Sequence, residues 1–147
     1  MAITREDFPL PDVDDRATAE FYAGAAAGEL RVPRCPQCGE FVWYPEPACP
    51  RDGGVPGWVA VSGRGTLFSW AVVQRAFLPA FADKVPFVSA LVAIDEDPRV
   101  RIPTIIVDAD PASLVADTAV EAVFRPLEFS TVPGKSVVVP MFRPVTT

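Results

Sequence analysis

The sequence predicts a mainly β protein: a short N-terminal helix, a small cysteine module, and then an antiparallel barrel. Three observations support this fold class. Seventeen prolines and nine glycines are spread over 147 residues and leave little room for long helices. Two short cysteine-bearing phrases lie between residues 35 and 54, and apolar segments of strand length follow them. Half of the residues are apolar, so the chain can bury a core.

The N-terminal region predicts an arm and one helix. Residues 1–14 are acidic and contain prolines, so we expect an extended arm. In the following "DDRATAEFYAGAAAGEL", Asp14 or Asp15 can cap a helix whose apolar residues lie on adjacent turns. Gly24 and Gly28 weaken this helix, so it needs tertiary support. Its apolar side fits either the barrel or a partner protein.

Strand patterns occupy most of the remaining chain. "ELRVPR" predicts a short strand that leads into the cysteine region, and "DPASL" predicts one helical turn that Asp110 starts. The further predicted strands are Trp58–Val61, Gly65–Gln74, Phe87–Ile94, Ile102–Val107, Ala119–Phe129 and Val137–Arg143. Five or six strands joined by turn-rich breaks suit a compact barrel of the OB-fold type.

The cysteine module has the layout of a zinc ribbon. Cys35 and Cys38 form one close pair, ten residues follow, and Cys49 and Asp52 form a second pair. Each pair keeps a proline after its first member and a glycine after its second, as in the tight turns called knuckles. We therefore expect Cys35, Cys38, Cys49 and Asp52 to hold a structural zinc ion.

Asp52 leaves an alternative open. Zinc accepts carboxylate oxygen, and a carboxylate carries the same charge as a thiolate. A ribbon that has lost its metal and is held by aromatic packing is the competing interpretation. A four-thiolate iron site is not available, and no general base stands near an open coordination position, as a catalytic zinc would require.

Composition excludes several function classes. The chain has no histidine, which removes Ser-His-Asp and Cys-His catalysis and a histidine-bound catalytic zinc. A net charge of −6 without any basic run argues against nucleic-acid binding. We see no signal-type segment and no apolar run of membrane-spanning length, so we expect a cytoplasmic protein without membrane association and with reduced thiols.

The order of motifs resembles one known family. "FYAGAAAGELRVPRC" is followed by "CPQCG", "YPEPACP", "WVAVSGRGTLFSW", "VPFVSALVAID" and "VPMFRPV". From about Phe21 to Pro144 the chain resembles the acyl-CoA-associated family called domain of unknown function thirty-five. The departure is Asp52, which stands where the family's motif has a fourth cysteine.

The resemblance implies a fold and a role. It implies an N-terminal arm and helix over residues 1–30, a rubredoxin-like zinc ribbon over 31–56, and an OB-fold barrel over 57–147. Family members commonly act as small non-catalytic subunits of thiolase-like enzymes, including thiolases, acyltransferases and sterol-carrier-type aldolases. Such a subunit stabilises its partner and helps to form the acyl-CoA entrance, and the CoA thioester is the substrate of the complex.

The loop "RAFLPAFADKVP" holds the candidate binding residues. Phe77 and Phe81 make it apolar, so it either folds over the barrel mouth or meets another surface. Arg64 and Lys84 are the candidate contacts for CoA phosphates, although turn charges are more often only solvated. No set of residues looks catalytic.

Three other functions remain as alternatives to the accessory subunit. The chain could be a free-standing acyl-CoA-binding module, or an OB-fold that binds single-stranded nucleic acid on aromatic platforms. It could also be an enzyme in its own right, in which case the cysteine thiols are the only obvious nucleophiles.

Overall fold

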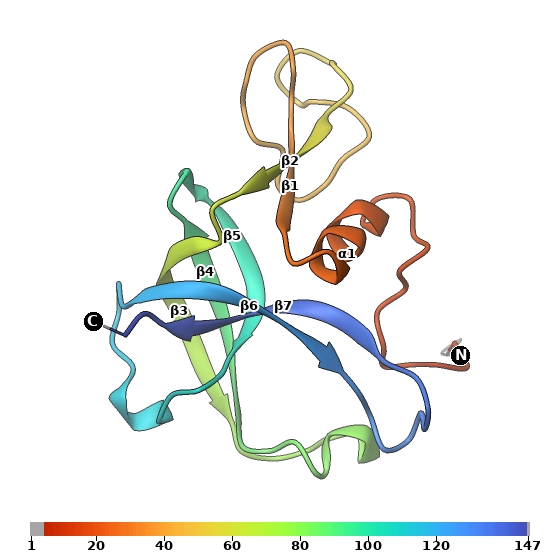
Figure 1. The fold of residues 1–147 in the computed structure, drawn as a ribbon, viewed down its shortest axis with the longest axis vertical. Helices are drawn as coiled ribbons and strands as arrows, with labels where there is room; N and C mark the ends of the chain where they lie inside the picture. Colours follow the sequence, from red (N-terminus) through yellow and green to blue (C-terminus); the bar gives the residue numbers. More distant parts are fainter. Residues whose placement is uncertain (1–4, 147) are drawn as a thin grey trace.

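The computed structural model describes residues 5–146 and has the predicted mainly β architecture (Figure 1). One α-helix, α1 (Ala19–Ala26), precedes a two-stranded ribbon and a closed five-stranded barrel. In Figure 1 the ribbon lies above the barrel, and α1 lies beside the ribbon and above β7. None of the helices in the described part is long and apolar enough to cross a membrane.

The N-terminal arm differs from its prediction. Residues 1–4 lie outside the described part, and residues 6–9 form turns rather than an extended strand. Leu10 is buried and packs with Phe129 and Val132 at one end of the barrel, which ties the arm down. The predicted cap is also wrong, because α1 begins after Thr18 and the Asp15 carboxylate accepts from Ala17 N–H in a preceding turn.

The ribbon is built on two antiparallel strands. β1 (Leu30–Arg34) pairs with β2 (Gly57–Val61), and the cysteine-bearing loops 35–56 extend between them. Residues 57–61, which the predicted boundary at residue 57 groups with the barrel module, pair with β1, and the closed barrel sheet begins at β3.

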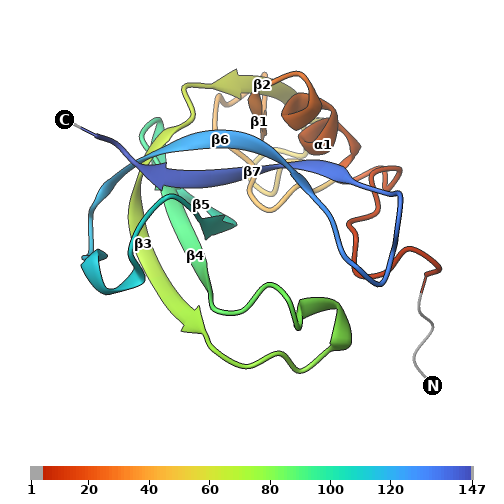
Figure 2. The same ribbon diagram turned by 60° about the horizontal axis from the view of Figure 1, so that its bottom comes forward.

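The barrel closes in the order β3-β4-β5-β7-β6 (Figure 2). Its strands are β3 (Arg64–Val73), β4 (Phe87–Ile94), β5 (Asp97–Ile106), β6 (Ala119–Leu127) and β7 (Val137–Pro144). Neighbouring strands are antiparallel except β5 and β7, which meet in parallel at Ile106 and Phe142. Closure removes free sheet edges, which is how an OB-type sheet avoids exposed backbone.

Short 3-10 turns interrupt two of the connections. η2 (Pro111–Ser113) begins at Asp110, whose carboxylate accepts from Ala112 N–H at 3.0 Å, as predicted. η1 (Pro79–Phe81) lies in the loop between β3 and β4 and was not predicted. Both turns begin with a proline that pre-sets the backbone.

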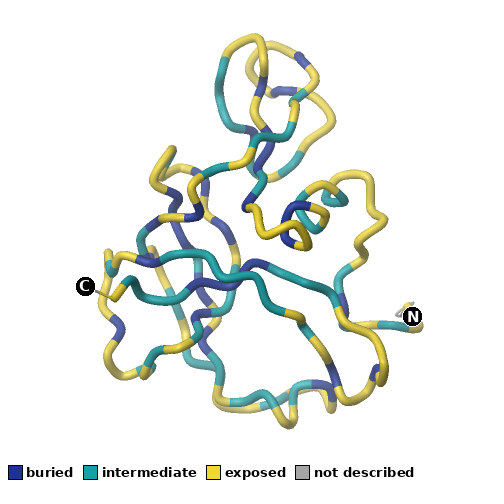
Figure 3. The backbone as a smooth tube through the Cα atoms, viewed as in Figure 1, coloured by how far each residue is buried: buried dark blue, intermediate teal, exposed yellow. Residues whose placement is uncertain are grey.

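Apolar side chains from all five strands fill the barrel. Figure 3 marks the buried residues along the backbone in dark blue. The fully buried ones include Leu67, Val92, Ile102, Val120 and Phe142. Two contacts tie the ribbon to this barrel. Trp43 Nε1 donates to the carbonyl oxygen of Arg101 at 2.9 Å, and Glu40 forms a 2.8 Å ion pair with Arg99.

Candidate functional site

Two local structures are the candidate sites: the cysteine module at the tip of the ribbon, and an apolar pocket at one end of the barrel. In the cysteine module, the donor atoms of Cys35, Cys38, Cys49 and Asp52 lie within 4.8 Å of one another. Cys35 and Cys49 are buried, and all three cysteines are free of disulfide bonds. The structure therefore brings together the four residues that the spacing singled out.

The spacing of the four groups fits a tetrahedral ion. Sulfur ligands on zinc bonds of about 2.3 Å are separated by about 3.8 Å, and a sulfur and an oxygen by about 3.6 Å. The Cys38 and Cys49 sulfurs are 3.7 Å apart, and the Cys35 sulfur is 3.4 and 3.6 Å from the two Asp52 oxygens. Three thiols and one carboxylate are also donors that zinc accepts, so the residues present fit this metal.

The electrostatics of the cluster favour a bound cation. The Glu40 backbone N–H lowers the pKa of Cys38, but desolvation, the thiols of Cys35 and Cys49 and the charge of Asp52 together raise it to about 11. The Arg51 backbone N–H lowers the pKa of Cys49. Four acidic groups in contact resist simultaneous ionisation, and a divalent cation would relieve that repulsion.

The pocket lies where the N-terminal arm and two loops meet the barrel. Its volume is about 550 Å³, within the range of small-molecule sites. Apart from Asp83 and Lys84 its lining is apolar: Pro9, Pro11, Phe81, Phe87, Ile105, Val107, Leu127, Phe129 and Met141. A second pocket of about 490 Å³ shares Asp83, Lys84 and Phe129 with it and adds Lys135.

Phe77 and Phe81 have different environments although only three residues separate them. Phe81 packs at the barrel end, with its ring 5.2 Å from Phe129 and 5.9 Å from Phe87. Phe77 is 86% exposed. The sequence left open whether this loop covers the barrel or meets another surface; the structure packs Phe81 at the barrel end and leaves Phe77 exposed.

Arg64 and Lys84, the two candidate contacts for CoA phosphates, lie in different parts of the molecule. Lys84 lies 5.0 Å from the centre of the Phe129 ring and lines both pockets. Arg64 is the first residue of β3, whereas the loop that carries Lys84 follows the other end of that strand. A ten-residue strand is roughly 30 Å long, so Arg64 and Lys84 do not serve one phosphate group.

Sequence reasoning missed most of the pocket and one part of the metal cluster. The N-terminal prolines and the β5, β6 and β7 residues of the pocket come together only through barrel closure. At the metal cluster, Gly54 N–H donates to Asp52 Oδ1 at 2.8 Å, and this hydrogen bond lowers the pKa of Asp52. Gly54, the second glycine of "DGG", was the only sign of this hydrogen bond in the sequence.

Sequence models of two domains match most of the chain. Residues 23–56 match the ChsH2 rubredoxin-like zinc ribbon domain, and residues 58–125 match the ChsH2 C-terminal OB-fold domain. The boundary between the two matches falls at the start of β2, so the OB-fold match includes β2 together with β3, β4, β5 and most of β6.

Two curated relatives align with the chain. One is the 3-oxo-4,17-pregnadiene-20-carboxyl-CoA hydratase alpha subunit of Mycobacterium tuberculosis, 39% identical over 110 residues that cover 74% of this chain. The alignment spans only 34% of that relative's own length. The other is a DUF35 domain-containing scaffold protein of Methanothermobacter thermautotrophicus, 36% identical over 96 residues, which cover 63% of this chain and 68% of the relative.

Two solved structures have similar folds. A chain of the Ltp2-ChsH2(DUF35) aldolase superposes with a TM-score of 0.74 and 27% identity, covering 91% of this chain and 98% of that one. A DUF35-family protein of unknown function from Sulfolobus solfataricus superposes with a TM-score of 0.56 over 89% of this chain and 87% of that one. At 11% identity, the second likeness shows the fold alone.

Proposed function

Because this chain belongs to the DUF35 family, whose ChsH2 ribbon and barrel it shares, we propose that it is a non-catalytic accessory subunit of a thiolase-superfamily enzyme acting on acyl-CoA. In this proposal the partner carries out the chemistry. The chain stabilises the partner and helps to form the entrance for the CoA thioester.

One observation carries the proposal. The chain superposes on 98% of a chain in the structure described as the Ltp2-ChsH2(DUF35) aldolase, a name that joins two components. The curated relatives are a subunit of a CoA-ester hydratase and a scaffold protein, and both names describe parts of larger assemblies. The thiolase-like nature of the partner rests on the family resemblance of the motifs.

The side chains support a non-catalytic role. Apart from the buried Cys35 and Cys49 of the ribbon cluster, no polar or charged side chain in residues 5–146 is buried. The three thiols are the only obvious nucleophiles, and they lie together in the ribbon cluster. We therefore assign them to structure.

The exposed Phe77 supports a contact with a partner. Phe77 is 86% exposed and lies next to Leu78, which is 43% exposed. Covering these apolar side chains with another protein removes them from water and so favours binding. Both residues belong to the β3–β4 loop whose Phe81 closes the barrel end. We propose that the loop is fixed at Phe81 and meets the partner through Phe77.

The apolar pocket supports contact with the acyl group. Its lining suits a hydrocarbon chain or ring system, and Lys84 and Lys135 line the adjoining pocket together with Asp83 and Glu128. We propose that Phe81 and Lys84 contribute to acyl-CoA binding at the entrance of the complex. Arg64, at the opposite end of β3, is not part of this site.

A structural zinc ion completes the proposal. Cys35, Cys38 and Cys49 would hold it together with Asp52, and the ion would fix the two knuckles, because the ribbon tip has almost no apolar core of its own. The free thiols are also consistent with a reducing cytoplasm, where we propose that the complex works.

Co-purification tests the role in a complex. The tagged chain is expressed in its native host at native level, and the proteins that elute with it by size exclusion are identified by mass spectrometry. We expect a thiolase-superfamily enzyme in constant ratio to the chain. Phe77→Asp should abolish this co-elution, whereas Val115→Asp, at a residue 63% exposed near η2, should leave it intact.

The pocket also favours one alternative, a free-standing acyl-CoA-binding module. Calorimetry with acyl-CoAs on the isolated chain separates the two functions. A carrier binds acyl-CoA alone with micromolar affinity, whereas an accessory subunit gains measurable affinity only in the complex.

A further inference from the structure

The two knuckles of the ribbon have the same backbone hydrogen bonds. Cys35 N–H donates to the Glu40 carbonyl oxygen at 2.8 Å, and Cys49 N–H donates to the Gly54 carbonyl oxygen at 2.7 Å. Each knuckle also has a glycine at φ +76°, Gly39 in the first and Gly53 in the second. The N–H of each glycine donates to the carbonyl oxygen of the cysteine that begins its knuckle. Asp52 therefore occupies the position of Cys38, and Gly54 occupies the position of Glu40.

Residues 40 and 54 occupy equivalent positions in the two knuckles, but the space around them differs. Glu40 turns its side chain outward, where it pairs with Arg51 and Arg99. At Gly54 an added Cβ would lie 3.0 Å from Asp52 Oδ1 and 3.1 Å from the Cys35 sulfur. Contacts this short are tighter than ordinary van der Waals contact, so the Asp52 carboxylate and the Cys35 sulfur would have to shift by a few tenths of an ångström to admit a side chain at residue 54.

The backbone N–H of Gly54 has a defined partner. It donates to Asp52 Oδ1 at 2.8 Å, which fixes the carboxylate while it faces the three thiols. In the first knuckle the Glu40 backbone N–H is directed to the Cys38 thiol in the same way. The knuckle's usual N–H to sulfur bond is thus replaced by an N–H to oxygen bond.

We propose that Gly54 is a positioning residue that makes the second knuckle a carboxylate-binding one, so that Asp52 is a built metal ligand rather than the remnant of a cysteine site. Gly54 N–H holds one carboxylate oxygen, and the missing Cβ leaves room for the other donors. This inference rests on the proposed zinc ion and does not depend on the proposed partner enzyme.

Metal affinity in four variants tests this inference. The full-length chain and its Gly54→Ala, Asp52→Ala, Asp52→Cys and Gly57→Ala variants are purified, stripped of metal, and titrated with Zn²⁺ against a chromophoric chelator. Gly57→Ala is the matched control, because nothing lies within 4 Å of a Cβ added there. Far-UV circular dichroism and thermal unfolding confirm that each barrel is folded.

We expect one zinc ion per wild-type chain, held as tightly by the Gly57→Ala control. Affinity should fall about 10- to 100-fold in Gly54→Ala, as for other outer partners of metal ligands, and at least as far in Asp52→Ala. Asp52→Cys should still bind. Gly54→Ala with wild-type affinity would overturn the positioning role, and Asp52→Ala with wild-type affinity would overturn the ligand assignment. A wild-type chain that binds no zinc would overturn the zinc proposal itself.

Absorption of bound Co²⁺ separates positioning from a general loss of structure. The wild-type chain should give the intense visible bands of a four-coordinate ion. In Gly54→Ala these bands should weaken, since more than one water molecule binds the ion where the carboxylate is displaced, which raises the coordination number above four. An unchanged Co²⁺ spectrum in Gly54→Ala would contradict the inference even if that variant were less stable.

Discussion

The indole Nε1 of Trp43 donates a 2.9 Å hydrogen bond to the carbonyl oxygen of Arg101, and this bond joins the ribbon loop to barrel strand β5. The same indole lies 5.9 Å from the Phe21 ring of α1. One side chain thus contacts the ribbon, the helix and the barrel, so the three parts hold a fixed arrangement at this point.

Two substitutions of Trp43 separate its hydrogen bond from its packing. Trp43→Phe keeps an aromatic ring and loses the donor, and we expect it to lower the free energy of unfolding by about 1 kcal/mol. Trp43→Ala loses both the ring and the donor, and we expect it to lower the free energy of unfolding by about 3 kcal/mol. Urea unfolding followed by circular dichroism measures both. Equal losses in the two variants would show that ring packing contributes nothing.

Gly65 lies where β3 and β4 leave no room for a side chain. A Cβ added there would lie 2.4 Å from the Ala93 carbonyl oxygen and 2.8 Å from Val92 Cγ1, so the two strands would have to separate. We expect Gly65→Ala to lower the free energy of unfolding by about 3 kcal/mol. Gly57→Ala serves as the control in the same thermal unfolding experiment, with less than about 1 kcal/mol of change. A Gly65→Ala chain as stable as this control would be inconsistent with the barrel packing.

Much of the fold could be predicted because its signals are local. Turn-rich breaks bounded the strands, and Asp110 with the following proline marked η2. The spacing of the cysteines and of the glycines after them predicted the two knuckles. Prolines, glycines and short polar side chains restrict the backbone around themselves, so a sequence displays them directly.

The rest depended on tertiary pairing. β5 begins at Asp97 rather than Ile102, because the charged stretch before Ile102 pairs with β4 after a tight turn at Asp95 and Glu96. Which strand β2 would join, and where Leu10 would be buried, are likewise set by distant partners. The different exposure of Phe77 and Phe81 also depends on tertiary structure, because only Phe81 packs at the barrel end.

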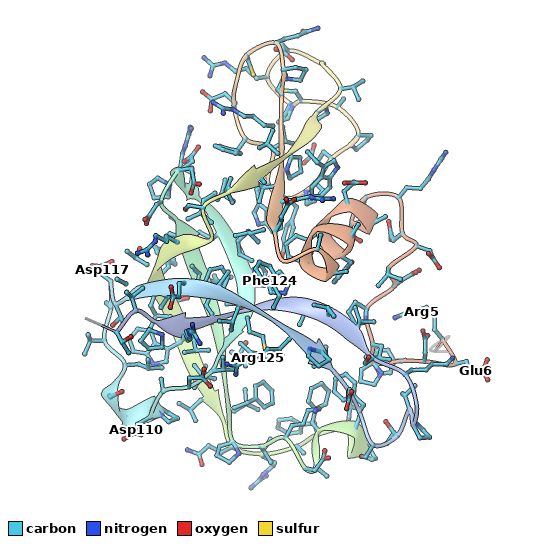
Figure 4. The ribbon with its side chains drawn as sticks, in the orientation of Figure 1. Arg5, Glu6, Asp110, Asp117, Phe124 and Arg125 are labelled. Carbon is cyan, nitrogen blue, oxygen red and sulfur yellow. The ribbon has the colours of Figure 1, made fainter. Side chains whose placement is uncertain are left out.

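The ion pair between Asp108 and Arg125 makes stability depend on pH. Arg125, labelled on β6 in Figure 4, donates two hydrogen bonds to the Asp108 carboxylate, and they lower the pKa of Asp108 from its usual value. A lowered pKa in the folded state contributes stability above the unfolded pKa, and that stability is lost as the pH falls through the folded pKa.

Asp108→Asn should therefore lower the urea midpoint at pH 7, with a difference from wild type that shrinks as the pH falls below about 4. Asparagine suits the positive φ of 55° at this position, so backbone strain stays the same. Asp117→Asn is the matched control, since Asp117 also has a positive φ and forms no ion pair within residues 5–146. A difference that persists unchanged at pH 2.5 would rule out the charge as its cause.

Asp52 should also set which metals the ribbon prefers. Soft ions favour thiolates over carboxylates, so replacing the single oxygen donor by sulfur shifts the preference towards them. We expect Asp52→Cys to raise the affinity for Cd²⁺ relative to Zn²⁺ by at least about tenfold. Competition titrations of both ions against a chelator measure this ratio, and an unchanged ratio would mean that residue 52 does not contact the ion.

Filling the apolar pocket should weaken acyl-CoA binding by the complex. Ile105 of β5 lines the pocket, and Ile105→Trp adds bulk inside it. We expect KM for a long or polycyclic acyl-CoA to rise about tenfold while the subunits still co-elute. Val115→Trp adds the same side chain at an exposed residue outside the pocket and should leave KM unchanged. Equal KM values in the two variants would exclude the pocket from the binding path.

The central claim, that this chain is an accessory subunit, is tested most directly by reconstitution. The thiolase-superfamily enzyme that co-elutes with the chain is purified alone, and its turnover of acyl-CoA and its thermal stability are measured with and without added chain. We predict that the chain alone is inactive, and that its addition raises both turnover and Tm to a plateau at a fixed subunit ratio. A partner that is fully active and stable alone, with no response to the chain, would contradict the account.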